Sequence, residues 1–208
     1  MARMFRVLRL ILLSSFCASP VLAQETLPVY LVQIFDTVAK YSPPPWINSP
    51  ESLGDSETFR NQVETVNGTN AFVLEYIPKG ESFEDWSELY AIFGETPLLG
   101  DVQGYRDAHI QGYANACSEV HWQGSNTTPP NTELFIVYCP SYIDRPEVGE
   151  ISTVVMMMKG ETLVKNYYHK RVPAFEYTPG GEQIMIYMNE IMDALVGLDR
   201  LEMIAAPN

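Results

Sequence analysis

The clearest pattern of apolar and polar positions lies between residues 71 and 94. Phe72–Ile77 is rich in β-branched and aromatic residues, which is typical of a buried strand. Pro78-Lys79-Gly80 ends this strand, because proline cannot donate a ladder hydrogen bond. Ser82 is then a suitable helix N-cap, and acidic residues follow it. Four apolar residues at helical spacing predict a helix packed by one face: Trp86, Leu89, Tyr90 and Phe93.

Two features precede this unit. Asn67-Gly68 between β-like segments predicts a two-residue hairpin turn that pairs Thr58–Val66 with Thr69–Ile77 and sets Phe59 opposite Tyr76. Val29–Lys40 fits a short helix or a strand equally well. Between them, Ser42 to Trp46 contains three prolines, which predict a stiff extended linker.

Strands outnumber helices among the elements predicted for the second half of the chain. Asp101 can cap a helix that reaches Cys117, and a short strand is expected at Val120–Trp122. Three further apolar runs predict strands at Glu133–Cys139, Ile151–Met158 and Thr162–Val172. The last element is an amphipathic helix, whose apolar stripe is Ile184, Met188, Ile191 and Leu195.

This order of elements lacks a regular β-α alternation. It predicts an α+β fold in which helices cover an antiparallel β-sheet, as an α/β/α sandwich. We expect a single α+β domain over 57–208, preceded by an N-terminal segment and proline-rich linker over 24–56. The length of the chain suits one domain with a substantial core.

The N-terminus has the pattern of a secretory signal peptide over 1–23. Arg3, Arg6 and Arg9 precede the apolar run from Leu10 to Phe16, and small residues lead to a cleavage site after Ala23. The apolar run is too short to be a permanent membrane anchor. The expected location is therefore the periplasm or the external medium, with no transmembrane segment.

Charge and cysteine content agree with export. The chain carries 26 acidic and 13 basic residues and a formal net charge of −13, which disfavours nucleic acid as a partner. After cleavage two cysteines remain, Cys117 and Cys139, and an oxidising compartment favours their pairing. On the loop-entropy model that disulfide would stabilise the fold by about 3 kcal/mol.

The strand-turn-helix sequence LEYIPKGESFEDWSELYAIF, with ELFIVYCP and the strands around MMMKG, resembles a known group of small exported bacterial proteins. These are the exported proteins with a DcrB-like or PsbP-like fold. The resemblance implies an antiparallel sheet with helices on its faces. It also implies an accessory or binding protein without catalytic residues of its own. Unlike the lipoprotein members, this chain has no lipobox, since Phe16 precedes Cys17.

One pair of residues could carry chemistry, and one further histidine is expected to be structural. Glu119 and His121 would share one face of a strand, where they could act as an acid-base pair or bind a metal, or simply face solvent. His109 would lie with Tyr105 and Tyr113 on the apolar side of a helix, where a packed structural role is expected. No metal site and no cofactor are predicted.

A basic and aromatic group stands out against the acidic background. It comprises Lys165, Tyr167, Tyr168, His169, Lys170 and Arg171. These residues could bind an anionic ligand or an acidic partner, or they could be the solvated edge of a sheet.

Three functions are therefore compared. The leading hypothesis is an exported, non-enzymatic protein that binds another envelope protein through the basic group. The second is an envelope-directed hydrolase that uses His121 with Glu119. The third is a small-molecule binding module built from Trp46, Trp86 and Trp122. The oligomeric state and the identity of the partner are left open by the sequence.

Overall fold

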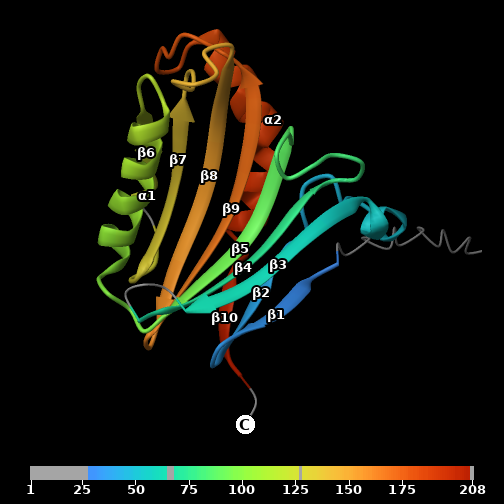
Figure 1. Cartoon of the computed structure of the whole chain (residues 1–208), viewed down its shortest axis with the longest axis vertical. Helices are drawn as coiled ribbons and strands as arrows, with labels where there is room; N and C mark the ends of the chain where they lie inside the picture. The colour runs from blue at the N-terminus through green and yellow to red at the C-terminus, as the bar shows by residue number, and fades with distance from the viewer. Residues whose placement is uncertain (1–27, 65–67, 127, 207–208) are drawn as a thin grey trace, which may run out of the picture.

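The computed structural model describes residues 28–64, 68–126 and 128–206, and its main element is a seven-stranded antiparallel sheet. The strands lie in the spatial order β3 (Ser56–Glu64), β4 (Asn70–Pro78), β5 (Glu88–Thr96), β9 (Thr162–Pro173), β8 (Val148–Lys159), β7 (Thr132–Cys139) and β6 (His121–Gly124) (Figure 1). The predicted strands over 133–139, 151–158 and 162–172 are confirmed as β7, β8 and β9.

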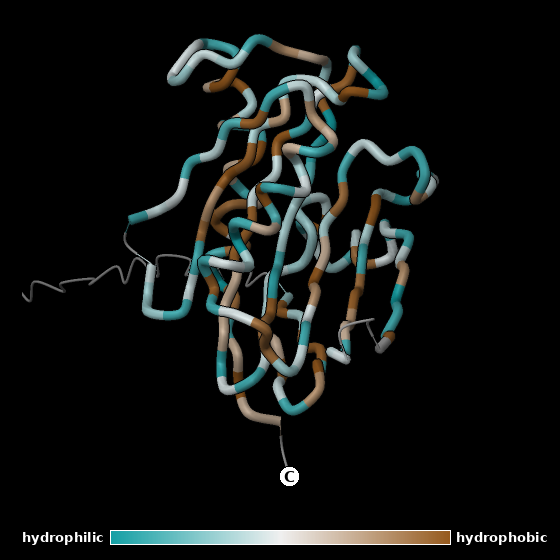
Figure 2. The backbone as a smooth tube through the Cα atoms, turned by 60° about the vertical axis from the view of Figure 1, so that its left-hand side comes forward, coloured by the Kyte–Doolittle hydropathy of each residue, from teal (hydrophilic) through white to brown (hydrophobic). Residues whose placement is uncertain are grey.

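Helices cover both faces of this sheet, which confirms the predicted α+β sandwich. α1 (Val102–Ala116) packs on β7 and β8, and α2 (Glu182–Leu198) packs on β8 and β9 from the other side (Figure 1). Side chains alternate between the layers: Phe135 and Val137 join the core under α1, whereas Ile136 and Tyr138 join the core under α2. Hydrophobic segments accordingly follow the strands, while the connecting loops are more polar (Figure 2).

The predicted helix over 82–93 is wrong. Ser82 accepts a hydrogen bond from the Asp85 amide (3.1 Å), but only a turn forms there, and the chain continues as strand β5. β5 lies between β4 and β9 and is covered on both faces, so its apolar residues are nearly continuous. Leu89 and Ala91 join the core on the α1 side of the sheet, and Tyr90 and Ile92 join the opposite core. A strand buried on both faces matches helical spacing by chance, because apolar residues occupy nearly every position.

The predicted hairpin forms, but its register differs by one residue. β3 and β4 pair antiparallel with Thr58 opposite Tyr76 and Phe59 opposite Glu75. The shift exchanges the side chains that meet across the pair, so Phe59 contacts Phe83 instead, with ring centroids 5.9 Å apart. The predicted two-residue turn is wrong, because a register that sets Glu64 opposite Asn70 needs an odd number of residues in the loop. Asn67 itself lies outside the described residues.

A small second sheet joins the two ends of the described chain. It contains β1 (Tyr30–Ile34), β2 (Thr37–Tyr41) and β10 (Glu202–Ala205), in that order. The strand alternative for Val29–Lys40 is therefore the one that forms. Ile34 and Tyr41 are buried in the core on the α2 side. Close approach requires Gly94 on β5, because a Cβ at that position would overlap Cγ2 of Ile34.

The remaining connections stabilise this arrangement. A disulfide joins Cys117, at the end of α1, to Cys139, at the end of β7, as predicted. Asp101 caps α1 by accepting a hydrogen bond from the Gly104 amide (2.8 Å). The chain between β2 and β3 includes a short 3-10 helix, η1 (Pro50–Gly54).

The N-terminal features are covered only in part. The predicted signal peptide over 1–23 and its cleavage site lie outside the described residues. Within the described ranges, neither helix has the length and apolar character needed to cross a bilayer. The disulfide is consistent with an oxidising compartment.

Candidate functional site

The predicted basic group does not lie on a sheet edge, because β9 is the fourth of seven strands. Alternation along β9 sends its side chains to opposite faces. Lys165, Tyr167 and His169 lie in the layer under α1, where Lys165 stacks over the Tyr167 ring at 4.7 Å. Tyr168 lies in the core on the other face. The expectation of one exposed basic edge is therefore wrong.

Lys170 is held in ion pairs on the α2 side of the sheet. Its Nζ lies 3.1 Å from Oε2 of Glu190 on α2 and 3.6 Å from Oε1 of Glu88 on β5. These contacts explain why a lysine can occupy a central strand, since both carboxylates offset its charge. Arg171 lines an open pocket, which is described below.

A buried carboxylate organises the layer beneath α1. Glu150 on β8 is 2% exposed, and it accepts hydrogen bonds from the hydroxyls of Tyr113 and Tyr142. Nδ1 of His169 lies 3.1 Å from its Oε1. Burial acts to raise the pKa of Glu150, but the charge of His169 and these hydrogen bonds outweigh it and hold the pKa below its ordinary value.

Two further basic groups lie in the same layer with shifted pKa values. Burial lowers the pKa of His109 to about 2, and the charges of Lys165 and His169 act in the same direction. Its ring packs on Phe135 at 5.7 Å, which is the expected structural role. Burial likewise lowers the pKa of Lys165 to about 8, although Glu95 and Glu75 oppose that shift.

An open pocket of about 390 Å³ lies beside this buried layer, where the loop before β8 meets the end of β9. Two guanidinium groups line it. Arg171 lies over the Trp86 ring at 3.8 Å, and Arg145 lies over the Tyr142 ring at 5.2 Å. Arg171 also donates to the Trp86 carbonyl (2.9 Å). We call this the arginine pocket; its lining residues are Asp85, Trp86, Arg145, Glu147, Val148, Arg171, Val172 and Pro173.

The buried carboxylate and the arginine pocket are physically connected through Tyr142. Its hydroxyl binds Glu150, and its ring supports Arg145 at the pocket wall. Both Glu150 oxygens already accept tyrosine hydrogen bonds, so this carboxylate acts as a support rather than as an exposed base. The pocket wall presents the guanidinium groups of Arg145 and Arg171, with the carboxylates of Asp85 and Glu147 beside them. A guanidinium group is suited to bind a carboxylate through paired hydrogen bonds.

The other predicted acid-base pair does form, on a different part of the surface. Nε2 of His121 lies 3.4 Å from Oε2 of Glu119, without a hydrogen bond between them. The imidazole stacks on Tyr177 with ring centroids 3.9 Å apart and planes inclined by 9°. Glu119 precedes β6 rather than lying within it. This geometry is that of a surface contact between an imidazole and a carboxylate, supported by an aromatic ring.

The three tryptophans do not form one site. Trp46 donates to Ser56 Oγ (2.8 Å), Trp86 lies beneath Arg171, and Trp122 lies beneath Arg106 at 5.1 Å. Within the ranges that the structure describes, no group of three His, Cys, Asp or Glu side chains is arranged to hold a metal ion.

Sequence reasoning missed Glu150, Tyr142 and Arg145. Glu150 stands at the start of the apolar run of β8, and an acidic residue beside such a run is a usable signal when a histidine occurs on the neighbouring strand. Arg145 and Tyr142 lie in a loop whose conformation depends on its contacts with β8. Local pattern therefore carries little information about them.

Comparison with known proteins does not assign this chain to a family. The chain matches no family model, no curated protein and no solved structure. The class that the observations define is an α+β sandwich with one disulfide and an arginine pocket. The resemblance to exported proteins with a DcrB-like or PsbP-like fold stays a prediction.

Proposed function

We propose that this chain is an exported, non-enzymatic protein of the cell envelope that binds an acidic group of a partner protein in the arginine pocket. The observation that carries the proposal is the placement of Arg145 and Arg171, each stacked on an aromatic ring, around one open pocket. Stacking orients the planar guanidinium group for carboxylate recognition before the partner arrives, which reduces the entropy lost on binding.

The charge of the whole chain gives this pocket its selectivity. With 26 acidic and 13 basic residues, most of the surface repels an acidic partner. A partner that presents a carboxylate at the arginine pocket meets attraction there and repulsion elsewhere, so its orientation is restricted. Asp85 lies 3.7 Å from Arg171, but it is 94% exposed, and solvent screens this pair.

Export is supported by the N-terminal sequence pattern and by the Cys117–Cys139 disulfide. A binding role agrees with the resemblance to accessory proteins of the envelope. The burial of Glu150, which is 2% exposed, supports a non-enzymatic role for the buried layer, because its carboxylate is not accessible to a substrate.

The test uses fluorescein-labelled hexaglutamate as a minimal acidic probe, with polarisation measured against the full mature chain. We expect saturable binding that Arg145→Gln weakens at least fivefold. The matched control is Arg106→Gln, since Arg106 also lies over an aromatic ring but pairs with Glu133 at 3.2 Å. Equal affinity of the Arg145→Gln variant, or equal binding of hexaglutamine, would contradict the proposal.

A positive result then guides identification of the partner. The tagged chain and its Arg145→Gln variant serve as paired baits for an envelope fraction, with mass spectrometry of the captured proteins. A stoichiometric protein that is captured by the first bait and lost with the second is the expected result. The same proteins on both baits would count against the arginine pocket as the binding site.

One observation favours a second candidate function. Glu119 and His121 lie 3.4 Å apart, and although no hydrogen bond joins them, a small side-chain movement would bring them to the distance of an acid-base pair. Unchanged hydrolysis of envelope material by a His121→Ala variant would exclude this site.

A further inference from the structure

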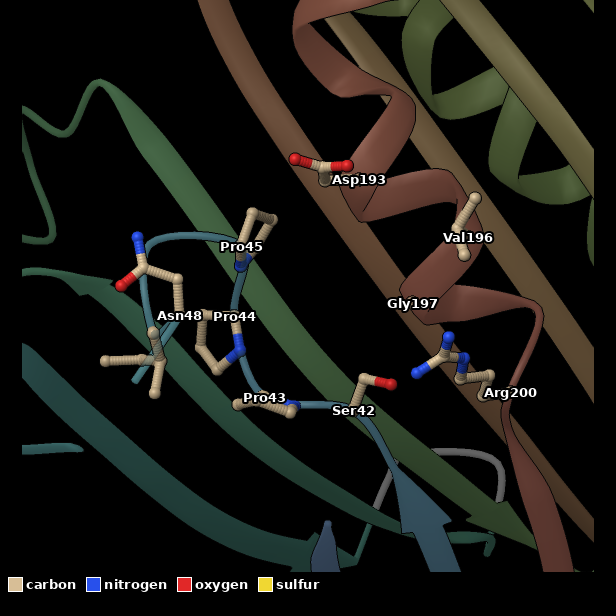
Figure 3. Close-up of a pocket in the computed structure, with 10 residues that line it drawn as sticks. Ser42, Pro43, Pro44, Pro45, Asn48, Asp193, Val196, Gly197 and Arg200 are labelled. Carbon is tan, nitrogen blue, oxygen red and sulfur yellow. The ribbon is translucent and has the colours of Figure 1, made fainter. Parts of the chain in front are cut away.

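A separate cleft lies on the opposite side of the molecule, between α2 and the chain that follows β2. It has a volume of about 280 Å³. One wall is the segment 42–48, which we call the proline strap, and the other is the last two turns of α2 (Figure 3). Pro43 to Pro45 and Val196 supply apolar surface. Asp193 lies on the helix, and Arg200 lies on the chain just after the helix ends (Figure 3).

The proline strap is held rigidly against the body of the protein. Tyr90 donates to the Ser42 carbonyl (2.8 Å) at one end, and Trp46 donates to Ser56 Oγ (2.8 Å) near the other. Three consecutive prolines restrict the backbone between these points. On the facing wall, a Cβ at Gly197 would lie 3.4 Å from Cβ of Ser42, so helix and strap meet closely there. The cleft is therefore formed before any ligand binds.

Arg200 joins this cleft to a second hollow of about 150 Å³. Both hollows are lined by Ser42 and Arg200, and the second continues to Val29 and Tyr41. Apolar side chains thus flank Arg200 on both sides: Val196 is 48% exposed and Val29 is 54% exposed. A chain that crosses Arg200 has space before and after it, which suits an internal segment better than a chain end.

The charges along the cleft are available for a ligand. Across the part of the chain that the structure describes, Arg200 and Asp193 take part in no ion pair, whereas the nearby Glu202 is paired with Lys40 at 3.1 Å. From Asp193 the helix continues to Leu198, a rise of about 7.5 Å, and Asp199 and Arg200 follow it in a turn. Two to three residues of an extended chain span a comparable distance, about 7 to 10 Å.

We propose that this groove, from Pro45 across Arg200 to Val29, binds an extended internal segment of a partner protein. The segment carries an acidic residue over Arg200 and a basic residue three positions away, at Asp193, with apolar residues between and beyond them. The groove lies on the α2 side of the sheet and the arginine pocket on the α1 side, so this binding is independent of the proposed function.

The test uses a library of octapeptides blocked at both ends, with lysine and glutamate fixed three positions apart and apolar residues at the flanking positions. Fluorescence polarisation measures their binding to the full mature chain. We expect saturable binding that falls at least tenfold with Arg200→Gln, and falls similarly when glutamine replaces glutamate in the peptide. Asp193→Asn should weaken binding only of peptides that carry the lysine.

Arg145→Gln is the matched control, because it removes a guanidinium group from the arginine pocket and leaves the groove intact. Thermal unfolding confirms that each variant is folded. Absence of saturable binding across the library would overturn the proposal. The proposal would also be overturned if Arg145→Gln, rather than Arg200→Gln, weakened binding. Tighter binding of peptides with a free C-terminal carboxylate than of the blocked peptides would overturn it as well. Concentration-dependent self-association abolished by Arg200→Gln would identify a second copy as the occupant and overturn it as well.

Discussion

Nδ1 of His169 lies 3.1 Å from Oε1 of Glu150, so neighbouring central strands of the sheet are joined by a buried carboxylate and an imidazole. Tyr113 on α1 and Tyr142 in the loop before β8 donate to the same carboxylate. One side chain therefore connects a helix, a loop and two strands. The arginine pocket depends on this connection through Tyr142.

Loss of the Glu150 charge should destabilise the fold. Glu150→Gln replaces the carboxylate with a weaker acceptor and leaves the buried groups that contact it poorly satisfied, so we expect the free energy of unfolding to fall by at least about 2 kcal/mol. Urea denaturation followed by tryptophan fluorescence measures it. Glu119→Gln is the control, since it alters a surface His–Glu pair and should change stability by less than about 1 kcal/mol. Equal effects of the two substitutions would contradict the structural role of Glu150.

Lys165 should make stability increase on the alkaline side of neutrality. Its pKa is lowered to about 8 in the folded state, from an ordinary 10.5. Between these values the unfolded chain retains a proton that the folded chain has released, so stability rises with pH. We expect this contribution to be roughly 2 to 3 kcal/mol and to disappear in Lys165→Met.

Lys170→Met provides the comparison for that measurement, because Lys170 lies in ion pairs on the other face of the same strand. Urea denaturation at intervals from pH 7.5 to 10.5 gives the slope for each variant. If the wild-type and Lys165→Met curves run parallel through this window, the pKa of Lys165 is not lowered in the folded state.

The disulfide should contribute strongly to stability. It closes a loop between residues separated by 22 positions, and replacing both Cys117 and Cys139 with alanine should lower the free energy of unfolding by about 3 kcal/mol. Reduction of the wild-type protein should produce a similar loss. A change below about 1 kcal/mol would mean that the unfolded chain is already compact in this region.

Two glycine substitutions should have opposite effects. Gly94→Ala places a Cβ against Cγ2 of Ile34 and should destabilise the fold by about 1 to 3 kcal/mol. Gly112→Ala on α1 meets no atom within 4 Å and should stabilise the helix by about 0.5 to 1 kcal/mol. Thermal unfolding of both variants tests the pair, and a stable Gly94→Ala protein would show that the small sheet can shift away from β5.

The fold was predictable where local pattern determines structure. Asp101 and the residues after it predict α1, the apolar stripe predicts α2, and the export pattern predicts the Cys117–Cys139 pair. The predicted helix over 82–93 fails because β5 is buried on both faces, a condition set by β4 and β9 rather than by its own residues. The hairpin register fails for a related reason, since packing of the whole pair decides which residues meet.

The candidate site was less predictable than the fold. Arg171 belonged to the predicted basic group. Because β9 is a central strand with side chains on both faces, Lys170 lies on the face opposite Arg171, and Lys165 lies beneath α1. Arg145 lies far from Trp86 in sequence, and the two line one pocket only because of the order of the strands. A pocket assembled from three distant segments leaves no local periodicity to detect.

The pairing of β10 with β2 also has a consequence for the order in which the protein is made. Lys40 and Glu202 are 162 positions apart, and their strands are neighbours. Synthesis begins at the N-terminus, so one edge of β2 stays unpaired until almost the whole chain has emerged. During that interval the hairpin of β1 and β2 presents an open backbone edge, which is a hazard for association with other chains. β10, near the end of the described chain, therefore covers the backbone edge of β2, near its beginning.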